Sequence, residues 1–554
     1  MKFYAAILIA VFAIFIYNSI VYRKRERQKL KEKIKNNWGS VPQREYEYEE
    51  LKKITFYFQS SKQDKFFVDD ITWNDLDMDS IFMLLNNTYS SAGEEYLYKI
   101  LRIPEFDKDE LNKRETLTAY FMEHEEDALR LQEIFAGLGR TRSISLLEFI
   151  HRLNDVEKRN NLRHIICDVL FLASVVLLFA MPLVGIISFF VMLIINIGTY
   201  YNEKASIESY FTCFKYLADM TNCADAIVKS DIEGIAEYKE GLKQNLQKLS
   251  KIRKGISMIS LNGNNGSIGE IIMEYVRMIF HVDIMSFNSM MDVTLKNIDT
   301  VDEMFETFGR LETGMAIASF RLSMPYYCVP EFETKKELDI QEMYHPMISE
   351  PVANDLTEAQ SVLITGSNAS GKSTFLKTVA INAILAQSIH TCTAKAYKTC
   401  FFRVYTSMAL RDDLMSKESY FIVEIKSLKR IMDAVNDETP ILCFVDEVLR
   451  GTNTVERIAA SSYILDTLRQ TNALCFAATH DIELTNILEN AYSNYHFTED
   501  VKEDDVLFSY KIMKGRATSR NAIKLLNIIG FDKEIVGNAE KMANRFIKEG
   551  VWEL

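Results

Sequence analysis

A glycine-rich segment in the last third of the chain combines residue types that bind phosphate. Residues 366–373 fit the pattern G-x-x-x-x-G-K-[ST] and lie between the apolar run 361–364 and a segment of helical character. In such a loop the backbone N–H groups surround phosphates, Lys372 neutralises the outer phosphates and Ser373 offers a hydroxyl to Mg²⁺. Because strand, loop and helix agree, a nucleotide site is favoured over a chance glycine-rich turn. The predicted phosphate-binding residues are Gly366, Ser367, Asn368, Ala369, Ser370, Gly371, Lys372, Ser373 and Thr374.

Three further polar residues follow apolar runs that are typical of strands. The run 441–445 leads into Asp446 and Glu447, and a second run ends just before His480. We assign Asp446 to Mg²⁺, Glu447 to the attacking water as general base, and His480 to the γ-phosphate or to the orientation of that water. An acidic pair meeting solvent and a structural histidine are the alternatives. The neighbouring phosphate loop favours catalytic roles for Glu447, His480 and Lys372.

The elements that must position these residues change character along the chain. From about residue 70 to 323, apolar residues recur at helical spacing, interrupted by the turn-rich stretch 262–267. After Pro325, short apolar runs alternate with helical segments, which is typical of a mostly parallel α/β sheet. We therefore expect a domain boundary near 325–345.

The composition indicates which partners and which cellular compartment suit the chain. Its formal net charge of −13 repels nucleic acid overall, so DNA binding requires a local basic face. The eight cysteines are scattered without a CxxC pair, which suits reduced core thiols better than disulfides or zinc. The bulk of the chain is therefore expected in the cytosol.

The first residues predict a membrane anchor. Residues 5–22 carry no charge and, at about 1.5 Å rise per residue, nearly cross a hydrocarbon core of about 30 Å. A signal peptide would carry its positive charge in front, so this anchor, 1–22, is expected to stay uncleaved. The basic juxtamembrane segment 23–69 places the N-terminus outside and the following residues inside. Nucleic-acid binding by its basic cluster is the alternative. The cluster comprises Arg23, Lys24, Arg25, Arg27, Lys29, Lys31, Lys33 and Lys35.

A second apolar tract, 165–201, is too long for one spanning helix but fits two short spans that turn near Pro182 and Gly185. Asp168 is its only charged residue and lies near one end, which favours an interfacial position over a proton relay. Three crossings return the chain to the cytoplasm. We therefore expect a multi-pass protein of the cell membrane that contacts lipid through three transmembrane helices, with its nucleotide domain in the cytoplasm. A buried hairpin in a soluble core is the alternative.

The motifs that carry the chemistry resemble one known family. The segments ITGSNASGKSTFLKT, LCFVDEVLRGTNT and FAATHDIEL resemble the ATPase domain of the MutS family, an ABC-like class of P-loop protein, over about 345–545. The resemblance implies ATP hydrolysis with Mg²⁺. Residues 419–424 resemble that family's S-x-F-x-x-E signature, which implies that Ser419 contacts the γ-phosphate bound by the opposite subunit. A composite site of this kind implies a homodimer.

Other segments extend the resemblance and limit it. His345-Pro346 and Asn354-Asp355 are similar to the family's segment near the adenine, and 450–454 to its loop after the second acidic motif. Residues 71–104 resemble the start of the MutS helical core, whose levers connect ATP sites to a DNA clamp. The family's mismatch-reading N-terminal domain has no counterpart in this resemblance. Residues 515–521 replace the family's Ser-aromatic-Gly, although helices similar to its dimerising tail follow.

The expected fold class is α plus α/β. It has an N-terminal transmembrane helix, a helical core or lever region at 70–340 interrupted by a transmembrane hairpin, and a C-terminal ABC-like P-loop ATPase domain at 341–554 with dimerising helices. Two functions remain open. One is a membrane-anchored MutS-like ATPase acting on mismatched or branched DNA, and the other is a membrane mechanoenzyme acting on a protein partner without DNA. An inactive scaffold is disfavoured because Glu447 and His480 are both present.

Overall fold

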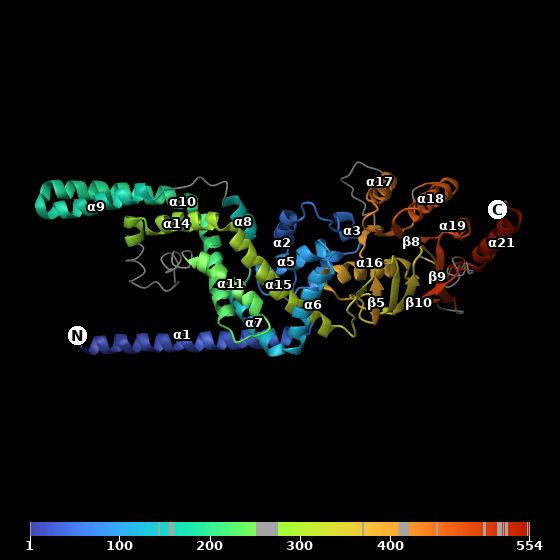
Figure 1. The fold of residues 1–554 in the computed structure, drawn as a ribbon, viewed down its shortest axis with the longest axis horizontal. Helices are drawn as coiled ribbons and strands as arrows, with labels where there is room; N and C mark the ends of the chain where they lie inside the picture. Colours follow the sequence, from blue (N-terminus) through green and yellow to red (C-terminus); the bar gives the residue numbers. More distant parts are fainter. Residues whose placement is uncertain are drawn as a thin grey trace. The chain divides into compact units, whose positions relative to one another are not determined.

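The computed structural model groups the chain into two compact units (Figure 1). The helical unit comprises Met1–Ser61, Asn86–Lys99 and Thr116–Ser319, and the α/β unit comprises Lys62–Leu85, Ile100–Glu115 and Phe320–Leu554. The chain thus passes between the units several times, and the contiguous domain ranges expected from sequence remain predictions. The residues described are 2–141, 145–153, 160–250, 275–367, 370–408, 420–449, 452–501, 506–517, 523, 526, 530–550 and 552.

A six-stranded sheet forms the centre of the α/β unit. Its strand order is β10-β9-β4-β8-β7-β6, and every neighbouring pair is parallel except β9 and β10. This arrangement agrees with the mostly parallel sheet expected from the alternation of apolar runs and helices. The strands are β4 (Val362–Thr365), β6 (Arg403–Ser407), β7 (Ile441–Asp446), β8 (Ala473–Thr479), β9 (Ser493–Val501) and β10 (Val506–Lys514).

Helices cover both faces of this sheet. Odd-numbered residues of β7 and β8, such as Cys443 and Cys475, pack in one buried cluster with Leu428 of α17 and Leu465 of α18. Because side chains alternate along a strand, the even-numbered residues face the other side, where α16 contacts β6, β7 and β8. The continuous apolar strands are therefore buried on two faces. The helices of this unit include α3 (Asp70–Asp75), α4 (Met78–Leu85), α16 (Lys372–Ile389), α17 (Tyr420–Asp433), α18 (Thr454–Arg469), α19 (Ile482–Ile487) and α21 (Lys533–Glu549).

A smaller sheet belongs to the same unit. Its order is β1-β5-β2-β3, with β1 and β5 parallel and the other pairs antiparallel. Its last strand begins at Asn354, one of the residues expected near a nucleotide base. The strands are β1 (Glu331–Phe332), β2 (Leu338–Met343), β3 (Asn354–Glu358) and β5 (Ala396–Thr399).

The helical unit is built around aromatic side chains at helical spacing. Phe135 and Phe308 are fully buried, with ring centroids 5.4 Å apart in an edge-to-face contact, and Phe214 and Phe287 meet in the same way at 5.3 Å. Its helices include α1 (Lys2–Asn37), α2 (Tyr48–Ser61), α7 (Glu125–Leu138), α8 (Leu146–Leu153), α9 (Leu162–Ala180), α10 (Pro182–Val228), α11 (Ala236–Lys248) and α14 (Val282–Lys296). Helices α5 (Ser91–Arg102), α6 (Lys108–Glu123) and α15 (Ile298–Ser323) have residues in both units.

Helices α9 and α10 form the hairpin expected from the apolar tract. Pro182 opens α10, where its missing N–H leaves no helical bond unmade. A Cβ on Gly185 would lie 2.5 Å from the backbone nitrogen of Leu178, so only glycine permits this close turn. Two stretches, Leu162–Ala180 and Pro182–Ala205, are long and apolar enough to cross a membrane, and only 17% of each is buried. That they do cross one stays a prediction.

Helix α1 is continuous from Lys2 to Asn37, so the predicted anchor and the start of the basic segment lie on one helix. In Figure 1 the amino-terminal end of α1 and the α9–α10 hairpin extend from the helical unit toward the same side.

A buried ion cluster ties several segments of the helical unit together. The Glu94 carboxylate is fully buried and lies 3.2 Å from Lys53 Nζ, 2.8 Å from Arg44 Nη1 and 2.8 Å from Arg140 Nε. Arg44 precedes α2, Lys53 lies within α2 and Arg140 follows α7. One carboxylate therefore contacts three cations that are distant in sequence.

Replacing Glu94 by alanine should destabilise the helical unit strongly. The change removes the carboxylate that these three cations share, although Arg44 keeps its ion pair with Glu50, and breaking a buried ion pair costs about 3–5 kcal/mol. The denaturation midpoint of the detergent-solubilised chain should fall accordingly. Asp292→Ala, which removes the exposed pair between Asp292 and Lys296, is the matched control and should change stability by less than about 1 kcal/mol. Equal midpoints for the two variants would refute this role of Glu94.

Candidate functional site

The predicted phosphate loop joins β4 to α16. Gly366 has a φ of +149° and Gly371 a φ of +101°, and both values belong to backbone regions that favour glycine. Space restricts the two positions as well. A Cβ on Gly366 would lie 2.8 Å from Ser370 Oγ, and one on Gly371 would lie 3.2 Å from the Tyr510 ring. The two glycines therefore permit the tight loop that the motif requires.

Lys372 opens α16 and bends back over this loop. Its Nζ donates hydrogen bonds of 2.6 Å to the carbonyl oxygens of both Gly366 and Ser367. The Ser370 hydroxyl also donates to the Ser367 carbonyl, at 2.8 Å. The ammonium is almost fully buried, so its positive charge is held at the mouth of the loop.

Ser373 and Asp446 come together although they are 73 positions apart. The Ser373 hydroxyl donates a hydrogen bond of 2.5 Å to Asp446 Oδ2. Asp446 ends β7, and the loop that precedes Ser373 follows β4, two strands away in the parallel sheet. Carboxyl ends of parallel strands meet at one edge, which explains the contact. The structure thus joins the hydroxyl and the carboxylate that the sequence assigned to one metal ion.

Glu447 and His480 also meet at this edge. His480 Nε2 lies 2.6 Å from Glu447 Oε1. The Glu447 N–H donates to the Ala478 carbonyl at 3.0 Å, and its φ of +58° is left-handed, so the chain turns sharply after β7. Both side chains are partly exposed, which leaves them accessible to substrate and water. The sequence proposed roles for both residues but not this direct contact.

An arginine and an aspartate next to this pair escaped the sequence analysis. Arg457 donates two hydrogen bonds to Asp481, at 2.8 and 2.6 Å, and these bonds raise the pKa of the guanidinium. Asp481 directly follows His480, and Arg457 lies in the first turns of α18. The bidentate pair fixes the chain beside the imidazole. Its only sequence signal was the position of Asp481 next to a predicted catalytic histidine.

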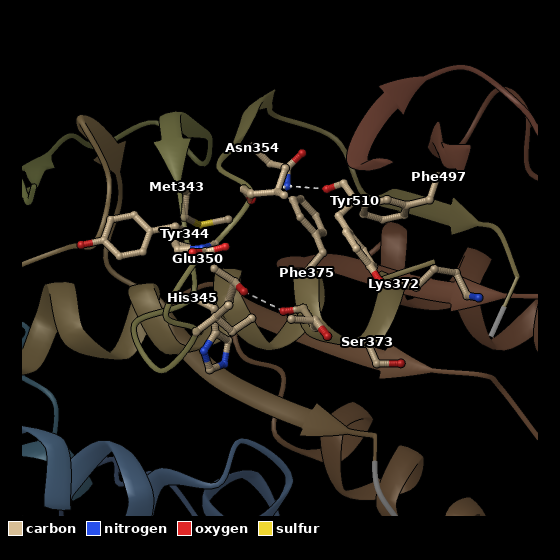
Figure 2. Close-up of a pocket in the computed structure, with 16 residues that line it drawn as sticks. Met343, Tyr344, His345, Glu350, Asn354, Lys372, Ser373, Phe375, Phe497 and Tyr510 are labelled. Carbon is tan, nitrogen blue, oxygen red and sulfur yellow. Dashed lines mark hydrogen bonds between the residues drawn. The ribbon is translucent and has the colours of Figure 1, made fainter. Parts of the chain in front are cut away.

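A cavity of about 460 Å³ adjoins the loop (Figure 2). Lys372 and Ser373 lie at one side of it, and Phe375, Phe497 and Tyr510 contribute aromatic rings. Its size and mixed lining suit an aromatic heterocycle attached to a charged group. Phe375 follows the phosphate loop directly in the sequence, whereas Phe497 and Tyr510 could not be predicted because β9 and β10 are distant from the loop in the chain.

The expected adenine segments reach this cavity in part. His345 and Asn354 line it, whereas Pro346 and Asp355 are not among its lining residues. Burial lowers the pKa of His345 to about 4, so its imidazole is neutral at pH 7. The Asn354 amide donates to the Tyr510 carbonyl at 3.0 Å, which holds β10 against the cavity (Figure 2).

Some predicted residues lie outside the described part of the chain. They are Asn368 and Ala369 of the loop, Ser419 of the signature segment, and Arg450 and Gly451. The other residues predicted to bind phosphate or the metal are described, and Thr374 lines the cavity beside Ser373.

The donor set suits Mg²⁺. It consists of a hydroxyl and one carboxylate, and hard oxygen ligands of this kind bind Mg²⁺ together with water and substrate phosphates. Within the described residues no group of three or more His, Cys, Asp or Glu side chains is placed to hold a metal. A closed zinc cage is therefore not present in that part of the chain, whereas an open magnesium site shared with a phosphate agrees with the geometry.

Comparison with known proteins points to the family that the sequence motifs resemble. Residues 362–547 match the family model described as MutS domain V. The chain is 29% identical to human "MutS protein homolog 4" over 336 residues, which are 57% of this chain and 35% of that protein. It is 31% identical to "DNA mismatch repair protein MutS" of Thermus aquaticus over 221 residues, covering 39% of this chain and 27% of that protein. The chain spans between about a quarter and a third of the length of these relatives. With the loop and strand-end carboxylates above, these matches show that residues 362–547 are a MutS domain V.

Proposed function

We propose that the α/β unit binds ATP with Mg²⁺ and hydrolyses it. The observation that carries the proposal is the contact between Ser373 and Asp446, because it places a hydroxyl and a carboxylate side by side at the edge of the sheet where Lys372 also lies. Parallel α/β sheets bind ligands at this edge. The aromatic cavity beside the loop supports adenine as the base.

In this proposal each residue has a separate role. Lys372 would move from its loop carbonyls to the outer phosphate oxygens, while Ser373 and Asp446 would hold Mg²⁺, which would neutralise charge on the phosphates. Glu447 accepts a proton from the attacking water. His480, 2.6 Å from that carboxylate, fixes its orientation and faces the γ-phosphate. Arg457 and Asp481 hold the histidine segment in place.

We also propose that two copies share the nucleotide sites. The resemblance of residues 419–424 to the S-x-F-x-x-E signature supports a contribution of Ser419 in trans. Helix α18, which follows the catalytic loop, exposes Val455 and Tyr463, each 79% accessible. Large apolar side chains on one helix face suit a subunit interface.

We propose that the conformational change driven by ATP acts on DNA. The relatives named DNA mismatch repair protein support it, and these proteins come from several bacteria. The net charge of −13 keeps the second function, action on a protein partner, open. We propose that the protein lies in the cell membrane with its ATPase domain in the cytoplasm. The exposed apolar hairpin supports this location.

Glu447→Gln should bind ATP with nearly normal affinity and hydrolyse it at least about 10²-fold more slowly, because the amide cannot accept the proton of the water. Equilibrium binding of a fluorescent ATP analogue and steady-state phosphate release measure the two properties. Glu438→Gln, at an exposed position in the same unit, is the control and should leave both unchanged. Near-normal turnover in Glu447→Gln would contradict the assignment of Glu447 as the general base.

DNA binding should depend steeply on salt. Each phosphate contact releases counterions, so the logarithm of the affinity for duplex DNA should fall by about 0.9 per contact for each tenfold rise in salt. Titration of fluorescent duplex and branched DNA with the detergent-solubilised full chain measures this slope. Saturable binding at low salt supports the DNA function. Its absence for every DNA structure tested would favour the protein partner.

The hairpin should hold the chain in the bilayer without the first helix. A variant lacking residues 2–22 should remain in the membrane pellet after alkaline extraction. Adding Leu172→Arg and Ile194→Arg, two exposed apolar positions inside the candidate spans, should release it, because an arginine at the centre of a span costs about 3 kcal/mol. A truncated chain that is soluble without these arginines would argue against the membrane hairpin.

A further inference from the structure

A buried carboxylate connects helix α3 to the strand that leads into the signature segment. Asp75 ends α3 and is 3% exposed. Its Oδ2 accepts a hydrogen bond of 2.7 Å from the Thr406 hydroxyl and one of 2.9 Å from the Met408 N–H. The Thr406 N–H donates to the Thr72 hydroxyl at 3.2 Å. Because these donors lie at the end of β6, α3 fixes where that strand stops.

A second contact links the start of α3 to helix α17. Asp69 caps α3 by accepting the Thr72 N–H at 2.8 Å, and its other oxygen lies 2.5 Å from Arg430 Nη1 of α17. The same guanidinium donates to the Thr406 carbonyl. Arg430 therefore connects α3, β6 and α17 at one point.

The other end of α17 reaches the catalytic loop. The buried Glu424 carboxylate accepts the Leu449 N–H at 2.5 Å, two residues beyond the proposed base Glu447. Glu447 and Leu449 both have left-handed φ values, +58° and +60°, which side chains other than glycine rarely adopt. Such a backbone persists only where its surroundings hold it. Glu424 supplies that hold from α17.

The segment that contains α3 is joined to the helical unit at both of its ends. Residues 62–85 belong to the α/β unit, whereas the chain on both sides, up to Ser61 and from Asn86, belongs to the helical unit. A force on the helical unit therefore acts on α3 through two covalent connections. Neither connection includes a residue of the phosphate loop.

We propose that α3 is a positioning element for hydrolysis, which acts through Arg430, α17 and Glu424 on the loop that carries Glu447. This inference rests on the proposed ATPase activity and names the residues that position its general base. Asp69, Asp75 and Glu424 are positioning residues and touch no substrate. Because the contacts end at the loop of the general base and leave Lys372 and Ser373 untouched, they set the rate of hydrolysis and leave ATP affinity alone.

The test measures kcat, KM and ATP affinity of the full chain in detergent for Asp75→Ala, Glu424→Ala and the double variant. Each single change should lower kcat at least about tenfold, because small misplacements of catalytic groups have large effects on rate. ATP affinity should stay within about twofold of the unmodified chain. The double variant should be no slower than the slower single variant, because both changes interrupt one series of contacts.

Conservative variants separate positioning from simple packing. Asp75→Asn and Glu424→Gln keep an oxygen that accepts these hydrogen bonds, so they should restore most of kcat. Asp69→Ser keeps a residue that caps α3 but removes the ion pair with Arg430, and it provides the test if Asp75→Ala does not fold. Asp433→Ala, which breaks the exposed pair with Lys429 on the same helix, is the control and should change nothing.

Three results would overturn the inference. They are unchanged kcat in Glu424→Ala, parallel losses of kcat and ATP affinity, and losses that multiply in the double variant. An unmodified chain without ATPase activity would instead contradict the proposed function.

Discussion

The hydrogen bond between Ser373 and Asp446 is the contact on which the site depends. It exists because β4, β8 and β7 are parallel neighbours, so the loop after β4 and the carboxylate at the end of β7 open onto the same edge. The strands are apolar and buried on both faces, which leaves their ends as the place where polar side chains reach solvent. The α/β unit thus positions its chemistry through the order of its strands.

A second constraint is the conformation of the chain after β7. Glu447 and Leu449 are left-handed without being glycines, and the loop is held by a backbone bond to Ala478 on one side and by Glu424 on the other. The proposed general base and the contact that holds its loop therefore lie within residues 447–449. The position of the proposed general base is thus imposed by its neighbours.

The sequence predicted what is local and missed what folding assembles. The phosphate loop, the carboxylates at the end of β7 and the hairpin turn at Pro182 and Gly185 follow from short patterns whose physical reasons lie within a few residues. The aromatic lining from Phe497 and Tyr510 does not, because β9 and β10 join the cavity only through the sheet order. The same holds for Asp75, whose acidic side chain looks solvent-facing in a helix until Thr406 and Met408 are placed against it. The alternation between two units was also invisible, since each crossing falls within or beside a helix of ordinary pattern.

The most direct test of the account is the Mg²⁺ dependence of ATP affinity in the unmodified chain and in Asp446→Ala. Equilibrium binding of an ATP analogue, with and without Mg²⁺, measures it without requiring turnover. If Asp446 and Ser373 hold the ion against the phosphates, Mg²⁺ should tighten binding in the unmodified chain and have little effect in the variant. An equal gain from Mg²⁺ in both proteins would contradict the assignment of this strand end as the metal site.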